Sequence, residues 1–153
     1  MDVQELSDIF EIQKLLTRYV FAIDDKDVDR LDQVFTPDAA IDYTAAGGVK
    51  GSLPQIKPWL KESLSRYPKT QHLIGLPDIV VDGDTARSRV MLINPMQCGP
   101  ELRNDVFLCG CVYADKLVRT PEGWRITHRV EEAQNFWFKD VPPDMPPAPP
   151  LEG

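Results

Sequence analysis

Histidine and cysteine, from which most metal centres and disulfide frameworks are built, are scarce in this sequence. Its 153 residues include two histidines, His72 and His128, and three cysteines. Neither type forms a compact cluster with the spacing of a zinc site, so we expect no metal and no cofactor. Cys109 and Cys111 point the same way along one expected strand, a poor geometry for a disulfide between them. We therefore expect free thiols, as in a protein of the reducing cytoplasm.

Long apolar runs and an excess of basic residues are also missing. No run approaches the roughly 18 apolar residues of a membrane-spanning helix. The first five residues are acidic and polar, so we do not expect them to be a signal peptide. The formal net charge is −7 and the sequence pI is about 4.8. Because nucleic acids and anionic membranes are bound by basic surfaces, we expect neither as a partner.

Two widespread catalytic motifs are absent as well. Gly47-Gly48 is not followed by the Lys-Ser/Thr pair of a phosphate-binding loop. No serine has the Gly-x-Ser-x-Gly setting of the hydrolase nucleophile. These absences argue against a nucleotide-binding protein and against a serine hydrolase of that type.

What the sequence does contain is one domain and a proline-rich end. Apolar residues make up 42% and charged residues 27%, which is ordinary for a globular chain with a core. Residues 141–153 hold six of the fourteen prolines, so they form neither a helix nor an inner strand. We divide the chain into a domain of residues 1–138 and a tail of residues 139–153. The tail is either a loose end or an arm that covers a pocket or a neighbouring subunit, anchored by Phe136, Trp137 and Phe138.

Three helices are expected from the spacing of apolar residues. The first runs from Asp8 to Asp24, because apolar residues recur every three or four positions, at Ile9, Ile12, Leu16, Tyr19, Val20 and Ile23. The same stripe ends on Asp24, a carboxylate that is costly to bury without a partner. Shorter helices are expected at residues 28–35 and 54–67.

Strands dominate the second half of the sequence. One short strand is expected between the helices, and an antiparallel series follows with a hairpin at Asp82-Gly83-Asp84. Their ranges are 40–44, 78–81, 85–93, 105–120 and 124–130, and residues 94–104, with two prolines, are expected to be a loop. Both faces of the strand from residue 105 are apolar near its start, so we expect that end to be covered on both sides. Helices against one antiparallel sheet are an α+β fold. A curved sheet around the first helix would enclose a cavity, with Asp24 near its mouth.

Asp24 and His72 are the candidate catalytic pair. A carboxylate that binds one ring nitrogen of a histidine fixes its tautomer and makes the other nitrogen more basic. Without such a contact, Asp24 would be a solvated acid at a helix end and His72 a structural histidine. Tyr43 is the third candidate, because a buried phenol can donate to an oxygen that gains negative charge. His128 alternates with Trp124 and is expected at the edge of the core.

Several stretches together resemble the SnoaL-like branch of the nuclear-transport-factor-2-like superfamily. They are the first helix with Asp24, Ile41-Asp42-Tyr43, Thr70-Gln71-His72-Leu73-Ile74-Gly75, the hairpin near Asp82 and Gly123-Trp124-Arg125-Ile126. The resemblance is nearest to the scytalone dehydratase, bile acid 7α-dehydratase and hexachlorocyclohexane dehydrochlorinase group. It implies a cone-shaped, cystatin-like α+β barrel with a deep hydrophobic pocket, and a homo-oligomer, with a trimer favoured over a dimer.

The resemblance also implies roles for individual residues. Asp24 and His72 match the catalytic pair of these enzymes, and Tyr43 matches a catalytic tyrosine. The residues that we expect to bind substrate are Tyr19, Trp59, Asn94, Cys111, Tyr113 and Phe136. The sequence departs from scytalone dehydratase at Ile23, at residues 94–96, which contain no histidine, and at Cys111 and Tyr113. We therefore expect a relative that acts on another substrate.

The resulting hypothesis is a cofactor-independent dehydratase, another lyase or an isomerase. Its substrate would be a small, mostly apolar molecule that is cyclic or bears a carbonyl group. One alternative is a non-catalytic module that binds small molecules or assembles with partners. Another is an epoxide hydrolase or cyclase, which would need an Asp–Arg–Asp set in the pocket. Arg87 and Arg89 lie on the polar side of their expected strand, which makes that set hard to assemble.

Overall fold

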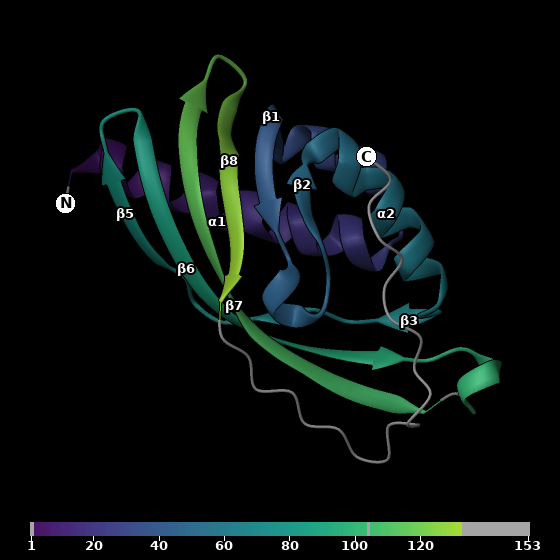
Figure 1. Cartoon of the computed structure of the whole chain (residues 1–153). Coiled ribbons are helices and arrows are strands. Elements are labelled where there is room, and N and C mark those ends of the chain that lie inside the picture. The colour runs from purple at the N-terminus through teal and green to yellow at the C-terminus, as the bar shows by residue number, and fades with distance from the viewer. Residues whose placement is uncertain (1, 104, 133–153) are drawn as a thin grey trace.

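One long helix crosses behind a strongly curved sheet, and a shorter helix lies beside the first two strands (Figure 1). The structure is a computed structural model that describes residues 2–103 and 105–132. The α-helices are α1 (Val3–Asp24) and α2 (Leu53–Ser65), and the 3-10 helices are η1 (Val28–Gln33), η2 (Thr44–Ala46) and η3 (Pro100–Leu102). The strands are β1 (Phe35–Asp42), β2 (Lys50–Ser52), β3 (Lys69–Thr70), β4 (Leu73–Ile74), β5 (Asp78–Asp82), β6 (Thr85–Gln97), β7 (Val106–Thr120) and β8 (Gly123–Glu132).

The eight strands form one sheet in the order β2-β1-β8-β7-β6-β3, and β4 and β5 also pair with β6. All pairs are antiparallel except β1 with β8, which is parallel. The predicted α+β fold with a curved sheet around the first helix is confirmed. The barrel is incomplete, because β2 at one edge does not pair with the strands at the other edge in the described chain.

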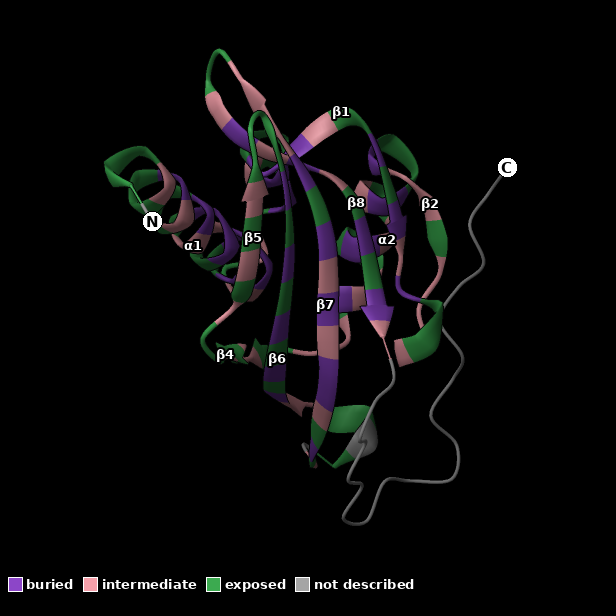
Figure 2. Cartoon of the chain, turned by 90° about the vertical axis from the view of Figure 1, so that its left-hand side faces the viewer, coloured by how far each residue is buried: buried purple, intermediate pink, exposed green. Residues whose placement is uncertain are grey.

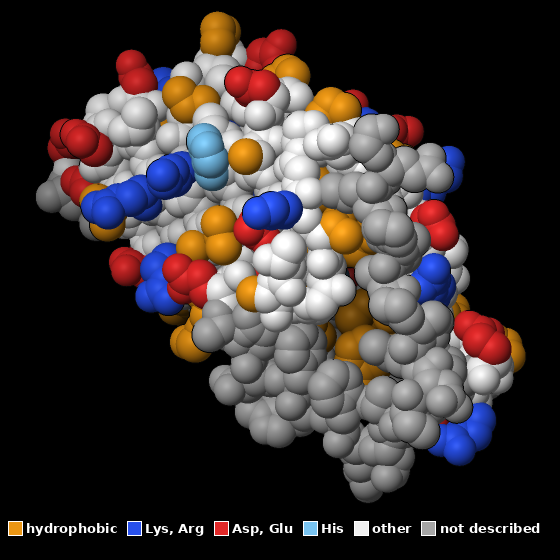
Figure 3. Space-filling view, viewed as in Figure 1, with side chains coloured by type: hydrophobic (Ala, Val, Ile, Leu, Met, Phe, Trp, Pro, Cys, Tyr) orange, Lys and Arg blue, Asp and Glu red, His pale blue; other side chains and the backbone are white. Residues whose placement is uncertain are grey.

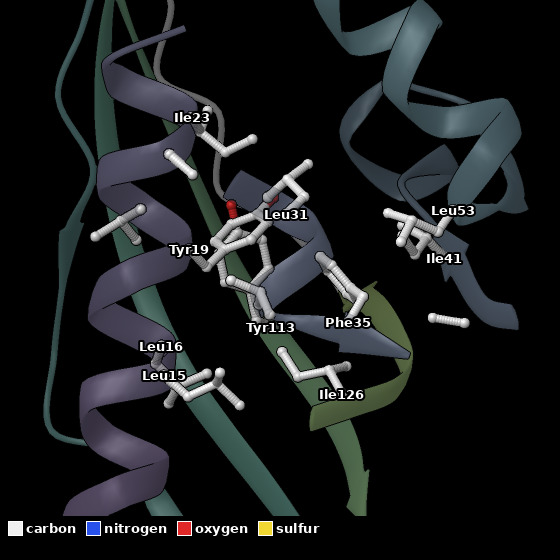
Figure 4. Close-up of a cluster of buried hydrophobic side chains, with 14 of the residues drawn as sticks. Leu15, Leu16, Tyr19, Ile23, Leu31, Phe35, Ile41, Leu53, Tyr113 and Ile126 are labelled. Atoms are coloured by element: carbon white, nitrogen blue, oxygen red, sulfur yellow. The ribbon is translucent and has the colours of Figure 1, made fainter. Parts of the chain in front are cut away.

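The apolar stripe of α1 is buried against the sheet, as its spacing predicts. Leu16, Tyr19 and Ile23 point from the helix toward the strands (Figure 4), and Ile12 is fully buried. The helix begins at Val3, earlier than expected, because Asp2 accepts a hydrogen bond from the backbone N–H of Glu5 at 2.8 Å and caps it. The second expected helix is a 3-10 helix of six residues.

β6 continues to Gln97, through residues expected to form a loop. The expectation rested on Pro95, Gly99 and Pro100, since proline and glycine usually interrupt a strand. The carbonyl of Pro95 accepts a hydrogen bond from the backbone N–H of Gln71 at 3.3 Å. In a strand the N and O of one residue point to the same side. The nitrogen of Pro95 therefore faces the gap between β3 and β4. Because it does not point toward β7, its lack of an N–H group removes no hydrogen bond between β6 and β7.

A bulge in β8 reverses which of its side chains face the core. Lys116 of β7 pairs with His128 and the next residue, Leu117, pairs with Ile126, so Thr127 is an extra residue on β8. His128 is consequently exposed, and its expected position at the core edge is wrong. Arg129 and Glu131 turn inward instead and are buried.

The outer face of the sheet is only partly polar. Buried and exposed residues alternate along β6, whereas along β7 most of the residues between the buried ones are intermediate (Figure 2). Hydrophobic side chains lie among charged ones on the face shown in Figure 3. Met91, Ile93, Val106 and Leu108 are exposed. Among the residues that the structure describes, only one face of the start of β7 is therefore covered. The cover that was expected on its other face is not found among them.

No helix among the described residues is long and apolar enough to span a lipid bilayer.

Asp8 connects the start of α1 to the β7–β8 hairpin. Two nitrogens of Arg119 donate to its two carboxylate oxygens at 2.7 and 2.8 Å, and the indole N–H of Trp124 donates at 3.2 Å. The hydrogen bonds from Arg119 outweigh the effect of burial and lower the pKa of Asp8 to about 2. Folding therefore favours the ionised carboxylate.

Replacing Asp8 with asparagine should lower the free energy of unfolding by about 1–2 kcal/mol at neutral pH. Because the folded-state pKa is lowered, this contribution is present above about pH 4 and disappears as the pH falls toward 2. Urea denaturation from about pH 7 down to pH 2 measures it, with Asp38→Asn on the exposed side of β1 as the control. Equal stability of Asp8→Asn and wild type at pH 7 would contradict the assignment.

Candidate active site

A cavity of about 360 Å³ lies between the C-terminal half of α1, α2 and the inner face of the sheet. This volume is typical of a small-molecule site. Seven of the expected site residues line it: Tyr19, Tyr43, Trp59, His72, Asn94, Cys111 and Tyr113. Asp24 lies behind His72, and Phe136 is outside the described residues. Sequence reasoning missed several other lining residues, of which Tyr67, Met96, Cys109 and Glu131 are the most distinctive.

Asp24 and His72 are in direct contact. Nδ1 of His72 lies 2.7 Å from one carboxylate oxygen of Asp24, and the backbone N–H of His72 donates to the other oxygen at 2.7 Å. The side chains of His72 and Asp24 are 6% and 18% exposed, so water competes little for this contact. The loop between β3 and β4 thus holds the imidazole against the end of α1.

Asn94, together with Asp24, determines which nitrogen of His72 carries the proton. Its amide oxygen accepts a hydrogen bond from the backbone N–H of Gln71 at 3.1 Å, so its NH₂ group is the part that faces His72. That nitrogen lies 3.2 Å from Nε2, and an NH₂ group can only donate. Nε2 is therefore the acceptor and Nδ1 carries the proton toward Asp24. This is the tautomer in which Nε2 serves as a base.

Thr70 and Lys26 extend the contacts of Asp24. The hydroxyl of Thr70 donates to Asp24 at 2.8 Å and accepts from the ammonium group of Lys26 at 2.8 Å. Burial alone would raise the pKa of Asp24, but its hydrogen bonds to the side chain and backbone of His72 and to Thr70 outweigh it. The pKa of Asp24 is therefore below its ordinary value, and the group is a carboxylate at neutral pH.

Two buried tyrosines supply hydroxyl groups. The hydroxyls of Tyr19 and Tyr43 are 2.8 Å apart, and either can be the donor. Burial raises the pKa of both groups, so both are protonated at neutral pH. The hydrogen bond between the two hydroxyls uses the proton of only one of them. When Tyr19 donates it, the proton of Tyr43 is available to a ligand.

The opposite wall of the cavity is formed by Trp59 and the loop after β1. The rings of Tyr43 and Trp59 are 6.2 Å apart at a tilt of 36°. A Cβ atom on Gly48 would lie 2.8 Å from Cβ of Tyr43 and 3.1 Å from the indole of Trp59, so only glycine fits there. The indole N–H of Trp59 is buried and finds no acceptor among the described residues.

Two of the three thiols line the cavity. Cys98, Cys109 and Cys111 are all free, so the prediction of free thiols is confirmed. A hydrogen bond from the Cys111 thiol lowers the pKa of Cys109, whereas the pKa of Cys111 is raised. No cluster of three or more metal-binding side chains occurs in the part of the chain that the structure describes.

Arg129 supports the tyrosines from behind and was not expected from the sequence. It is fully buried and donates through two nitrogens to Asp115, each at 2.7 Å. Its guanidinium lies 4.0 Å from the ring centre of Tyr19 and 4.2 Å from that of Tyr113, which stand side by side in Figure 4. Arg129 does not line the cavity, and Arg87 and Arg89 are exposed, so the Asp–Arg–Asp set of an epoxide hydrolase is not assembled from these arginines.

Glu131 is an acidic group that lines the cavity, and it is 9% exposed. It lies opposite Tyr113 in the β7–β8 register. Burial, together with Cys109, raises the pKa of Glu131 to about 8, although Arg129 opposes the shift. No sequence signal pointed to Glu131, because the bulge at Thr127 places it on the inner face.

Comparison with known proteins identifies the family to which the chain belongs. The family described as SnoaL-like domain matches residues 4–130. An uncharacterised protein of Mycobacterium tuberculosis is 51% identical over 131 residues, which are 86% of this chain and 88% of that protein. The resemblance to the SnoaL-like branch is therefore confirmed.

Two solved structures show the same fold at low identity. A nuclear transport factor 2-like superfamily protein of Salmonella enterica has a TM-score of 0.73 at 17% identity, covering 92% of this chain and 99% of that one. A Novosphingobium aromaticivorans protein, provisionally named a scytalone dehydratase, has a TM-score of 0.77 at 16% identity, covering 92% and 95%. Such likenesses show the fold alone, because function diverges within a fold.

Replacing Arg129 with methionine should lower the free energy of unfolding by about 3–5 kcal/mol, since it leaves the charge of Asp115 buried and unpaired. Urea denaturation measures the loss. Adding Asp115→Leu removes the unpaired charge and should restore most of the stability. If Arg129→Met alone were as stable as wild type, the pair would not support the inner face of the sheet.

Proposed function

The chain belongs to the SnoaL-like domain family, and on that premise we propose that it is a cofactor-independent dehydratase-type lyase or isomerase. Its substrate is a small, mostly apolar molecule that is cyclic or bears a carbonyl group. The observation that carries the proposal is the hydrogen-bonded order Asp24–His72–Asn94 in the cavity wall, which leaves Nε2 of His72 unprotonated. The provisional name of the Novosphingobium neighbour agrees with this class of reaction.

The reaction is a proton transfer through His72. Nε2 removes a proton from the carbon next to the substrate carbonyl, and Asp24 stabilises the imidazolium that forms. The proton of Tyr43 forms a hydrogen bond to the carbonyl oxygen as that oxygen gains negative charge. Nε2 then returns its proton to a hydroxyl two carbons from the carbonyl. The carbon–oxygen bond breaks, a carbon–carbon double bond forms, and water leaves.

Asn94 must release Nε2 before this step. Once protonated, Nε2 would present an N–H to the NH₂ group of Asn94, and two donors cannot form a hydrogen bond. The substrate therefore takes the place of the Asn94 amide at Nε2. The 3.2 Å separation is at the long end of the hydrogen-bond range, which makes this exchange inexpensive.

A second candidate is a binding module without catalysis. It is favoured by the same contact, because Asn94 already occupies the lone pair that a base would use. In that case the Asp24–His72 pair only holds the wall of the cavity in place. Ligand binding without turnover is the behaviour that distinguishes this candidate.

The assembly state and the compartment stay predictions. We propose a homo-oligomer, with a trimer favoured over a dimer, in which a second copy covers the apolar outer face of β6 and β7. The exposed side chains of Met91, Ile93, Val106 and Leu108 support this, because contiguous exposed apolar surface marks interfaces. We place the protein in the cytoplasm because its three cysteines are free.

Replacing His72 with glutamine should lower the rate of dehydration by about 10²–10⁴-fold, because general base catalysis is lost. The probe is the aldol of benzaldehyde and acetone, a β-hydroxy ketone that loses water to form benzalacetone, which absorbs in the near ultraviolet. The control is His128→Gln, which changes the exposed histidine and should leave the rate unchanged. Unchanged turnover in His72→Gln would reject the mechanism. Probe binding without turnover by the wild type would favour the binding module.

A further inference from the structure

Glu131 and Trp59 both line the cavity with a buried polar atom that finds no hydrogen-bond partner among the described residues, and the proposed mechanism uses neither. Of the two, Glu131 is the titratable group. The ring nitrogens of His72 both have partners, and the hydroxyls of Tyr19 and Tyr43 bind each other. Oε2 of Glu131 is buried and finds no hydrogen-bond partner among the described residues. A buried polar group without a partner is costly, so its persistence in a cavity wall suggests that a ligand completes it.

The position of Glu131 follows from the shape of the sheet. The bulge at Thr127 turns it to the inner face, where it lies opposite Tyr113 of β7. It reaches the same cavity as Cys109, which belongs to the strand beside it, and as His72, which lies on the far side of β6. The cavity therefore has an imidazole and a carboxyl group that come from different edges of the sheet.

The cation nearest to Glu131 in the chain does not neutralise it. Arg129 lies two residues earlier on the same face, but two of its nitrogens are held by Asp115. The charged and titratable groups that influence Glu131 are Arg129 on β8, Cys109, Cys111 and Tyr113 on β7, Tyr19 on α1, Asp42 on β1 and Tyr43 directly after it. Arg129 is the one cation among them. Burial dominates, and the carboxyl holds its proton at neutral pH.

We propose that Glu131 is the polar anchor of the cavity, a neutral carboxylic acid that donates a hydrogen bond to a carbonyl oxygen of the ligand. A buried acid that stays protonated can serve as such a donor. The ligand class is therefore neutral and carbonyl-bearing with an apolar ring system. A carboxylate ligand is rejected, because it would add a negative charge to a cavity that already has Asp24 behind one wall. The inference deepens the proposed function and rests on it for the view that this cavity holds the substrate.

The anchor predicts that binding depends on pH. Above about pH 8 the carboxyl of Glu131 ionises, loses its donor proton and repels the oxygen of a carbonyl. The affinity for a neutral ketone should therefore fall by about tenfold or more between pH 6 and pH 9.5, the change that one lost hydrogen bond produces. By linkage, a bound ketone should shift the ionisation of Glu131 to higher pH.

The test is binding of methyl naphthyl ketone and of naphthoate to the full chain, followed by quenching of tryptophan fluorescence. Wild type should bind the ketone more tightly at pH 6 than at pH 9.5, and naphthoate more weakly than the ketone. Glu131→Gln keeps a neutral donor at every pH, so its affinity for the ketone should not change between these values. The matched control is Glu132→Gln, which removes the neighbouring carboxylate that pairs with Arg89 and should behave as wild type.

A further variant distinguishes the ionisation of Cys109 from that of Glu131. The pKa of Cys109 is lowered by its hydrogen bond with Cys111, so the ionisation of this thiol has to be distinguished from that of Glu131. Cys109→Ser should retain the pH dependence if Glu131 causes it. Loss of the pH dependence in Cys109→Ser, its persistence in Glu131→Gln, or equal ketone affinity of wild type at both pH values would overturn the proposal. Failure of wild type to bind the ketone at pH 6 would overturn it as well.

One measurement uses only the wild-type protein, so it does not depend on whether a variant folds. Carbon-13 NMR of the glutamate carboxyl groups of wild type should show one group that ionises near pH 8, and ketone binding should move that titration upward. An unchanged titration on ketone binding counts against the anchor. The anchor and the proposed function can fail separately, because His72→Gln should lose dehydration yet keep the pH-dependent binding of the ketone.

Discussion

The structure depends on what surrounds the carboxylate of Asp24. This group ends α1, is mostly buried, and accepts hydrogen bonds from the hydroxyl of Thr70, the backbone N–H of His72 and the imidazole. An ionised carboxylate out of water must be compensated in this way, or it becomes protonated. Because two of the donors belong to His72, the contact joins the helix to the β3–β4 segment and orients the ring. The imidazole then meets Asn94 on β6, and the cavity wall is complete.

A second charge system stands at the other side of the cavity. The bidentate contact between Arg129 and Asp115 lies beneath the rings of Tyr19 and Tyr113. Since Asp115 already compensates Arg129, little positive charge is left for Glu131, which therefore holds its proton. The same cavity thus contains a base whose proton has been directed away from it and an acid that keeps its proton.

The elements that depend on local pattern could be predicted from the sequence. The apolar stripe predicted α1 and its end at Asp24, and the resemblance of Thr70–Gly75 to a known family placed His72 beside it. What could not be predicted depends on pairing between distant segments. The strand that begins at residue 85 was expected to end before Pro95. Only the tertiary contact with Gln71 shows that the nitrogen of Pro95 faces an unpaired gap, so that the strand can continue. The bulge at Thr127 leaves no mark in the alternation, so His128 was expected at the edge of the core. Glu131 was missed, because it lies past the expected end of the last strand at residue 130. Phe136 lies outside the described residues.

The central claim is that Asp24, together with Asn94, fixes the tautomer of His72, and nitrogen-15 NMR of the two histidine side chains tests it most directly. In the neutral ring of wild-type His72, Nδ1 should show the shift of a protonated nitrogen and Nε2 that of an unprotonated one. Asp24→Asn removes the carboxylate and should move both shifts toward a mixture of tautomers, whereas those of His128 should not change. A wild-type His72 with its proton on Nε2, or one that does not respond to Asp24→Asn, would contradict the account.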